Sequence, residues 1–227
     1  MSIVNRSEIR ARTESEKEFK MLKPYYQDEY CTIYNADCHE VLPQLEPVDL
    51  VLTDPPYGIK RFVKGIGNGD RMKNKSCCGF NNNVPTKEFF ETLIKLSKES
   101  IFWGMNNFEL PCTEHFLVWD KEQTVDNFAS AELAWCNISK PAKVFRYSIH
   151  QHNPNKFGGH PTEKPLLLFI WCVALANNPQ TVLDPFMGSG TTLRAAKDLG
   201  RKAIGIEIEK KYCDIAIERL RQEVLAL

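Results

Sequence analysis

The segment TVLDPFMGSGTT, residues 181–192, decides the fold. Its first four residues predict a short buried strand, because they are mostly apolar and a turn follows them. Gly188 and Gly190 then predict a tight turn, and a helix is expected to begin near residue 190. Glycines let the backbone pass close to a ligand, and a helix N-terminus offers unpaired N–H groups. This order of elements indicates a ligand site, with a ligand-free tight turn as the alternative.

The next strand favours a nucleotide-like ligand. KAIGIEI, residues 202–208, is expected to be a strand, and Glu207 near its end follows the first glycine by about 20 residues. A carboxylate at that spacing is well placed to accept hydrogen bonds from ribose hydroxyls. Leu193 stands where a dinucleotide-binding loop has its third glycine. The pattern therefore indicates a nucleotide-like cofactor on the edge of a Rossmann-like sheet, and it weakens a dinucleotide reading.

The segments on either side alternate between strand and helix patterns. VDLVLTD, residues 48–54, is almost continuously apolar, as expected of a buried parallel strand. Further strands are expected at 31–37, 101–105, 115–119 and 142–149, and helices at 87–100, 164–177, 190–199 and 209–224. This alternation predicts an α/β fold, with a mostly parallel, mixed sheet and helices on both faces.

Composition indicates the class of protein, but it does not identify a binding partner. The 227 residues are 43% hydrophobic, which favours one folded domain over a disordered chain. The 29 basic residues equal the 29 acidic ones, so net charge gives no support for a nucleic-acid partner. No apolar run approaches the roughly 20 residues of a membrane span, and the charged N-terminus is unlike a signal peptide. The eight cysteines lack C-x-x-C spacing and are read as reduced thiols, with a zinc site at Cys77, Cys78 and a nearby histidine as the alternative.

We expect an N-terminal arm over residues 1–30 and a single domain over residues 31–227. Inside that domain, residues 58–83 form a long polar segment with five glycines, and we predict a mobile loop there. The segment carries six basic side chains against one acidic side chain. Such a local excess of positive charge is suited to contact with phosphates, with a solvated flexible loop as the alternative.

The segment TDPPYG, residues 53–58, follows the strand at 48–54 directly. Two prolines fix two backbone angles, so a carboxylate, a carbonyl and an aromatic ring are held rigidly at the carboxyl end of a strand. Open α/β sheets bind their ligands at that edge. A proline-stiffened turn in which Asp54 only caps the backbone is the alternative.

This set of groups suits the activation of an amino group on an aromatic ring. The lone pair of such a nitrogen is delocalised into the ring, which makes the nitrogen a poor nucleophile. Hydrogen bonds from its two N–H groups to Asp54 and to the carbonyl of Pro55 would hold it closer to tetrahedral geometry, while Tyr57 stacks on the ring. Catalysis would then rest on positioning and on a preorganised polar site.

Four segments resemble the motifs of the DNA amino-methyltransferases that use S-adenosylmethionine. Residues 54–57 resemble the catalytic motif of that family, residues 184–192 its cofactor motif, residues 160–165 the segment before the cofactor motif, and residues 35–38 its adenine-binding turn. The catalytic motif precedes the cofactor motif, which is similar to the circularly permuted beta class. The resemblance covers residues 31–213 and implies transfer of a methyl group to N6 of a flipped-out adenine in DNA.

The resemblance also implies roles for individual residues. The catalytic residues would be Asp54, Pro55, Pro56 and Tyr57. Asp37 and Cys38 would contact the adenine of S-adenosylmethionine, Phe186, Gly188 and Gly190 would line the cofactor, and Glu207 would bind its ribose. Thr162 and Lys164 would hold the methionine carboxylate, and Asp184 would lie near the methionine amino group. His160 is read as a loop residue, and Cys38 packing alone is an alternative for that position.

Double-stranded DNA is the partner that the resemblance implies, and two basic regions are expected to contact it. The predicted DNA-binding residues are Lys60, Arg61, Lys64, Arg71, Lys73, Lys75, Lys143 and Arg146. The last two belong to residues 137–157, where the family carries its target-recognition region. This region is short, which favours a short or relaxed target, or recognition aided by a second subunit.

Other functions stay open at this point. The same chemistry could act on N4 of cytosine or on a base in RNA, although Asp54 favours adenine because the cytosine enzymes more often carry Ser there. A nucleic-acid-binding protein with a decayed active site is a second class, and a nicotinamide oxidoreductase is a weaker one. The resemblance further suggests restriction-modification in the cytoplasm of a bacterial or phage-infected cell. It leaves open a homodimer and a restriction endonuclease partner.

Overall fold

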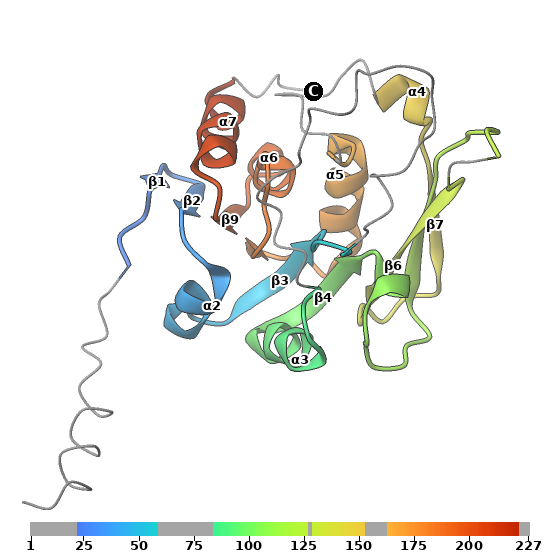
Figure 1. Cartoon of the computed structure of the whole chain (residues 1–227), viewed down its shortest axis with the longest axis horizontal. Coiled ribbons are helices and arrows are strands. Elements are labelled where there is room, and N and C mark those ends of the chain that lie inside the picture. The colour runs from blue at the N-terminus through green and yellow to red at the C-terminus, as the bar shows by residue number, and fades with distance from the viewer. Residues whose placement is uncertain (1–21, 59–83, 127–128, 153–162, 223–227) are drawn as a thin grey trace, which may run out of the picture.

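The central feature of the computed structural model is one nine-stranded sheet (Figure 1). The structure describes residues 22–58, 84–126, 129–152 and 163–222. The strand order is β1-β2-β9-β8-β3-β4-β6-β5-β7. The strands are β1 (Tyr26–Gln27), β2 (Cys31–Tyr34), β3 (Val48–Thr53), β4 (Ser97–Trp103), β5 (Phe116–Asp120), β6 (Ala131–Cys136), β7 (Lys143–Arg146), β8 (Thr181–Asp184) and β9 (Lys202–Ile206).

The sheet is parallel through its centre and mixed at its sides. Strands β2, β9, β8, β3 and β4 pair in parallel, and so do β5 and β7. Strand β1 runs antiparallel to β2, and β6 runs antiparallel to both β4 and β5. This arrangement confirms the expected α/β fold with a mostly parallel, mixed sheet.

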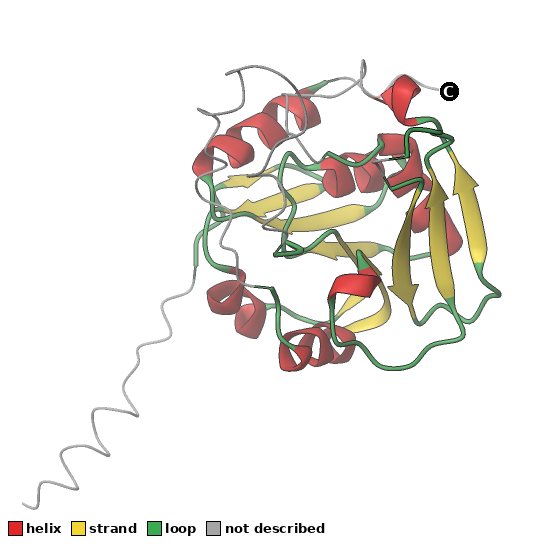
Figure 2. Ribbon diagram, turned by 45° about the vertical axis from the view of Figure 1, so that its right-hand side comes forward, coloured by secondary structure: helices red, strands yellow, loops and turns green. Residues whose placement is uncertain are grey.

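Helices cover both faces of the sheet (Figures 1 and 2). The helices are α2 (Cys38–Val41), α3 (Lys87–Leu96), α4 (Ile149–His152), α5 (Leu166–Leu175), α6 (Thr191–Asp198) and α7 (Lys210–Arg221), with short 3-10 turns at Leu42–Gln44 and Met105–Asn107. Helices α5, α6 and α7 pack with one core cluster, which includes Leu168, Leu193 and Leu220. Helices α2 and α3 pack with the other, which includes Val41 and Phe90. No helix in the described ranges is long and apolar enough to cross a membrane.

Four segments differ from the sequence-based expectation. The helix expected over residues 87–100 ends at Leu96, because residues 97–103 pair with β3 as β4. Strand β6 was not predicted, and residues 150–152, expected in a loop, belong to α4. Residues 26–27 of the expected N-terminal arm pair with β2, and the hydroxyl of Tyr25 donates to Asp214 of α7 at 2.7 Å. Local pattern does not reveal β4 or β6, because each pairs with a strand distant in the sequence.

One carboxylate, that of Asp49, links the N-terminal ends of neighbouring strands in the sheet. Asp49, near the start of β3, accepts hydrogen bonds from the backbone N–H groups of Gln180 (2.8 Å) and Thr181 (3.0 Å). The ammonium of Lys98 in β4 lies 2.6 Å from its other oxygen. Asp49 therefore links the starts of three neighbouring strands at the edge opposite Asp54.

Replacing Asp49 with asparagine is expected to lower the free energy of unfolding by about 1–2 kcal/mol at neutral pH. The hydrogen bond from Lys98 is the largest cause that lowers the pKa of Asp49 from 3.8 to about 2. A lowered carboxyl pKa stabilises the folded state above pH 3.8, and this stabilisation is lost as pH falls through about 2. Urea unfolding at several pH values measures it.

The matched control is Asp126→Asn at an exposed turn position. The control is expected to unfold like the wild type, within about 0.5 kcal/mol. The difference between Asp49→Asn and the wild type should shrink between pH 4 and pH 2. A difference that keeps its size over that range would show that the charge of Asp49 contributes nothing.

Candidate active site

The two glycine- and proline-containing turns leave the same edge of the sheet from adjacent strands. β3 and β8 pair in parallel, with Leu50 opposite Val182 and Val51 opposite Leu183. At their ends, the hydroxyl of Thr53 donates to Oδ1 of Asp184 at 2.7 Å. The turn that begins with Asp54 and the turn that contains Gly188 therefore start side by side, although about 130 residues separate them in the chain.

Asp184 holds the glycine turn in place with its own oxygens. The side chain is 2% exposed, and it accepts hydrogen bonds from Thr53, from the hydroxyl of Thr192 and from the N–H of Phe186 (3.0 Å). Burial raises the pKa of Asp184 to about 6. The sequence expectation placed this residue near a methionine amino group. In the structure both carboxylate oxygens are already engaged by the chain, because the buried acid must be satisfied locally.

The glycine turn brings backbone N–H groups close to Glu207. Gly188 and Gly190 have φ angles of 51° and 79°, a region that favours glycine. A Cβ atom on Gly190 would lie 2.7 Å from the Cβ of Ala216 in α7, so the turn also requires a small residue for packing. The N–H of Gly188 donates to Oε2 of Glu207 at 3.1 Å. The structure thus brings together the glycines and the acid that the sequence analysis connected.

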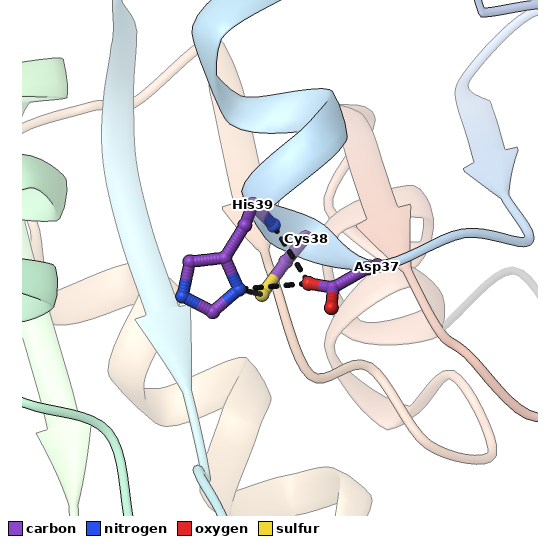
Figure 3. Close-up of side chains that lie close together, drawn as sticks. All are labelled: Asp37, Cys38 and His39. Atoms are coloured by element: carbon purple, nitrogen blue, oxygen red, sulfur yellow. Dashed lines mark hydrogen bonds and ion pairs between the residues drawn. The ribbon is translucent and has the colours of Figure 1, made fainter.

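The predicted adenine-binding turn lies beside Glu207. Asn35 donates from Nδ2 to the carbonyl oxygens of Glu207 and Ile208, both at 2.9 Å. Asp37 caps α2, accepting from the N–H of His39 at 2.9 Å (Figure 3). These contacts fix the turn at residues 35–38 against the end of β9.

Asp37, Cys38 and His39 also form a cluster of metal-ligand types (Figure 3). Nδ1 of His39 lies 2.8 Å from Oδ1 of Asp37, and the sulfur of Cys38 lies 3.8 Å from the same nitrogen. Oδ1 of Asp37 also accepts from the backbone N–H of His39, so the described contacts of Asp37 are those of a helix cap. The arrangement suits a helix cap better than a metal site.

An aromatic wall extends from this turn toward the glycine turn. The rings of His39 and Phe89 lie 5.1 Å apart between centroids, and those of Phe89 and Phe186 lie 5.5 Å apart. Phe89 comes from α3 and was not among the predicted site residues. Together with Glu207 and the glycine turn, these rings offer apolar and polar groups that fit an adenine and a ribose.

Tyr57 closes the turn at residues 54–57, the predicted catalytic turn. Its hydroxyl donates to Oδ1 of Asp54, and burial raises the pKa of Tyr57 well above its ordinary value, so the phenol stays neutral. Gly104, after β4, has a φ angle of 80°, and a Cβ atom there would lie 2.1 Å from Cε1 of Tyr57. Only glycine leaves space for the ring at this position. Sequence reasoning missed this role, although Gly104, inside the strand expected at 101–105, was a visible signal.

Lys164 lies beside the turn at residues 54–57. Its ammonium contacts Oδ2 of Asp54, lies 3.3 Å from the hydroxyl of Tyr57 and 3.1 Å from Oε2 of Glu132 in β6. Oε1 of Glu132 in turn pairs with Lys121 at 2.5 Å. Lys164 was expected to hold a methionine carboxylate, but here two carboxylates of the chain share its charge. Glu132 and Lys121 were missed because no motif marks them.

Several predicted residues lie outside the described residues, and the structure says nothing of them: Thr162, Lys60, Arg61, Lys64, Arg71, Lys73 and Lys75. The same holds for His160 and for the zinc alternative at Cys77 and Cys78. Lys143 and Arg146 are described, and both are exposed on β7. Nε of Arg146 lies 3.6 Å from Oδ2 of Asp120, so its charge is partly compensated.

Comparisons with known proteins agree with this geometry. Residues 118–218 match the family described as DNA methylase. The chain is 30% identical to the Type II methyltransferase M.HinfI of Haemophilus influenzae, over 89% of this chain and 71% of that protein. It is 38% identical to the DNA adenine methyltransferase YhdJ of Escherichia coli, over 86% of this chain and 84% of that protein.

A solved structure shares the fold. The crystal structure of the M1.HpyAVI-SAM complex superposes with a TM-score of 0.55 at 23% identity, covering 85% of this chain and all of that chain. The similarity in sequence to M.HinfI and YhdJ extends over most of this chain and most of each relative. The chain therefore belongs to the family of S-adenosylmethionine-dependent DNA methyltransferases.

Proposed function

We propose that this chain transfers the methyl group of S-adenosylmethionine to N6 of a flipped-out adenine, in a short or relaxed site of double-stranded DNA. One observation carries the proposal: Asp54 follows β3, and the turn with Gly188 follows β8, which pairs with β3. A target base near the first turn and a cofactor near the second would meet over one sheet edge. The name of YhdJ, a DNA adenine methyltransferase, supports adenine.

The proposed cofactor contacts use the groups at that edge. Asp37 and Cys38 contact the adenine ring, and Phe186 adds apolar surface. Glu207 accepts from the ribose hydroxyls; burial raises its pKa, but its two N–H partners keep it an acceptor. Gly188 and Gly190 would let the backbone approach the cofactor, and Thr162, which lies outside the described residues, would contact the methionine carboxylate. When bound, S-adenosylmethionine supplies an activated methyl group on a positively charged sulfur.

The proposed catalytic contacts orient the target nitrogen. Asp54 and the carbonyl of Pro55 accept hydrogen bonds from the two N–H groups of the adenine, which aims the nitrogen lone pair at the methyl group. Tyr57 offers an aromatic surface to the base, and Pro56 stiffens the turn. The N–C bond forms as the S–C bond breaks, and the extra proton on nitrogen leaves to water. A strong general base is not required, because the sulfonium is a good leaving group.

The proposed DNA contacts are electrostatic. Residues 60–75 and the exposed Lys143 and Arg146 would pair with phosphates, so binding should weaken steeply between about 50 and 200 mM salt. The short region at 137–157 supports a relaxed target or help from a second copy of the chain. A restriction endonuclease with the same target site would be the partner in a restriction-modification pair. We further propose that residues 31–227 act as one methyltransferase domain.

The function is tested by methyl transfer to DNA. We expect the purified chain with methyl-labelled S-adenosylmethionine to label duplex DNA. Digestion of that DNA to nucleosides should release the label as N6-methyl-2′-deoxyadenosine. Samples without DNA, or with RNA of the same sequence, are the controls and should stay unlabelled. Label in N4-methylcytosine would overturn the base assignment, and label in RNA alone would overturn the choice of DNA.

A further inference from the structure

The ammonium of Lys164 is enclosed by acceptors of the catalytic turn and of β6. Its side chain is 7% exposed. The nitrogen contacts Oδ2 of Asp54, lies 3.1 Å from Oε2 of Glu132 and 3.3 Å from the hydroxyl of Tyr57. The ammonium donates hydrogen bonds to Asp54 and Tyr57, whereas it pairs with Glu132 by charge, and the buried Oε2 of Glu132 has no hydrogen-bond partner among the described residues.

The charges around Lys164 balance. Asp54 and Glu132 are the two carboxylates of the cluster, and Lys164 and Lys121 are its two ammonium groups. The side chains of Glu132 and Lys121 are 22% and 15% exposed, so water screens these pairs little. Moving the buried ammonium of Lys164 to a cofactor would leave Asp54 and Glu132 beside each other with one fewer counter-charge, which is costly.

We propose that Lys164 is a positioning residue for the catalytic carboxylate: with Glu132 as its second anchor, it keeps Asp54 ionised and turned toward the target amino group. This inference rests on the proposed function for the role of Asp54. It replaces a direct role of Lys164 in holding the methionine carboxylate. Because a carboxylate accepts about four hydrogen bonds, Asp54 can bind Lys164, Tyr57 and the target base at once.

The charged groups around Asp54 determine whether each substitution should raise or lower the pKa of Asp54. Burial raises the pKa of Asp54, the ammonium of Lys164 opposes that rise, and the carboxylate of Glu132 adds to it. Tyr57 donates to Asp54 from the same turn, and Asp184 lies behind it at the end of β8. Removing Lys164 should therefore raise the pKa of Asp54, and neutralising Glu132 should lower it.

Lys164→Met tests the inference, since methionine keeps the apolar stem of the side chain. We expect the pKa of Asp54, followed by carboxyl carbon NMR and assigned with the Asp54→Asn spectrum, to rise by about 1 unit or more. The acid limb of the kcat–pH profile should move upward with it. The dissociation constant for S-adenosylmethionine, measured by calorimetry, should stay within about twofold of the wild type.

A weaker cofactor affinity by tenfold or more, with the pKa of Asp54 unchanged, would overturn the inference and return Lys164 to the methionine carboxylate. An unchanged pKa with unchanged affinity would overturn it as well. Neither the NMR titration nor the calorimetry requires turnover. A wild type that transfers no methyl group would therefore count against the proposed function, and the titration would still decide the role of Lys164.

Two further variants complete the test. Glu132→Gln keeps an acceptor for Lys164 and should lower the pKa of Asp54, the opposite of the effect of Lys164→Met. A raised or unchanged pKa of Asp54 in this variant would contradict the inference. This test remains valid if Lys164→Met fails to fold. Lys98→Met is the matched control, because Lys98 also pairs with an aspartate, Asp49, at the other edge of the sheet. It should leave the pKa of Asp54 unchanged.

Discussion

Replacing Asp54 with asparagine is expected to lower the rate of methyl transfer by at least about 10²–10³-fold. The amide keeps one acceptor oxygen, but it loses the negative charge and presents an N–H₂ group to the N–H₂ group of the target. The nitrogen lone pair would then no longer be held toward the methyl group. Single-turnover labelling of duplex DNA with saturating enzyme measures this step directly.

The control for Asp54→Asn lies five positions earlier, near the start of the strand that Asp54 follows. Asp49→Asn makes the same chemical change at the opposite end of β3. We expect this control to lose stability and keep its rate of transfer, whereas Asp54→Asn keeps its affinity for S-adenosylmethionine and loses the rate. A transfer rate of Asp54→Asn within about fivefold of the wild type would rule out the proposed role of the carboxylate.

Replacing Arg219 with methionine is expected to lower the free energy of unfolding by about 3–5 kcal/mol. In α7, Nη2 of Arg219 pairs with Oε1 of Glu163 at 2.6 Å, and the two side chains are 6% and 5% exposed. Nη1 donates to the hydroxyl of Thr191 at 2.5 Å, and Ser189 donates to Oε2 of Glu163 at 3.1 Å. Removing one partner of a buried pair leaves the other charge poorly compensated.

Such a loss is a large part of the 5–15 kcal/mol that stabilises typical domains, and urea unfolding can measure it. Arg201→Met is the control, because that guanidinium makes exposed hydrogen bonds to Asn178 (2.8 Å) and Gln180 (3.1 Å), and it should cost about 0.5 kcal/mol or less. Adding Glu163→Gln to Arg219→Met should restore about 1 kcal/mol or more. If the double variant is less stable than Arg219→Met alone, the two side chains do not act as an ion pair.

The same pair is expected to affect the cofactor site. Ser189 and Thr191 flank Gly190 in the glycine turn, and both contact the pair through their hydroxyls. Loss of Arg219 should therefore weaken binding of S-adenosylmethionine as well as lower stability. Glu163 also directly precedes Lys164, so the pair helps to fix the segment from which Lys164 reaches Asp54.

The sequence predicted those parts of the site that depend on short segments. The turns at 54–57 and 188–190 were visible because proline and glycine have few or special backbone conformations, and each turn follows an apolar strand. The sequence connected Glu207 with the glycine turn because one helix and one strand separate Glu207 from Gly188, which is the spacing expected of a ribose-binding acid. In all three cases, the residues of a short segment were sufficient to predict the feature.

Other parts depended on contacts between distant segments. Glu132 lies in β6, a strand that was not predicted, and it meets Lys164 only because β6 pairs with β4. The roles of Gly104 and Phe89 depend on the rings of Tyr57 and Phe186, which belong to other elements. The hydrogen bonds from Thr53 and Thr192 to Asp184 also join separate segments, and a linear motif does not reveal them.

The pairing of β3 with β8 has a consequence for how the protein acquires its activity. The two strands close a loop of about 130 residues, and the entropy of closing so long a loop must be offset before their contacts form. On a ribosome, the catalytic turn is made early but can meet its neighbour only after residue 184 has emerged. In refolding from urea, recovery of methyl transfer should therefore lag behind the far-ultraviolet signal of the local helices.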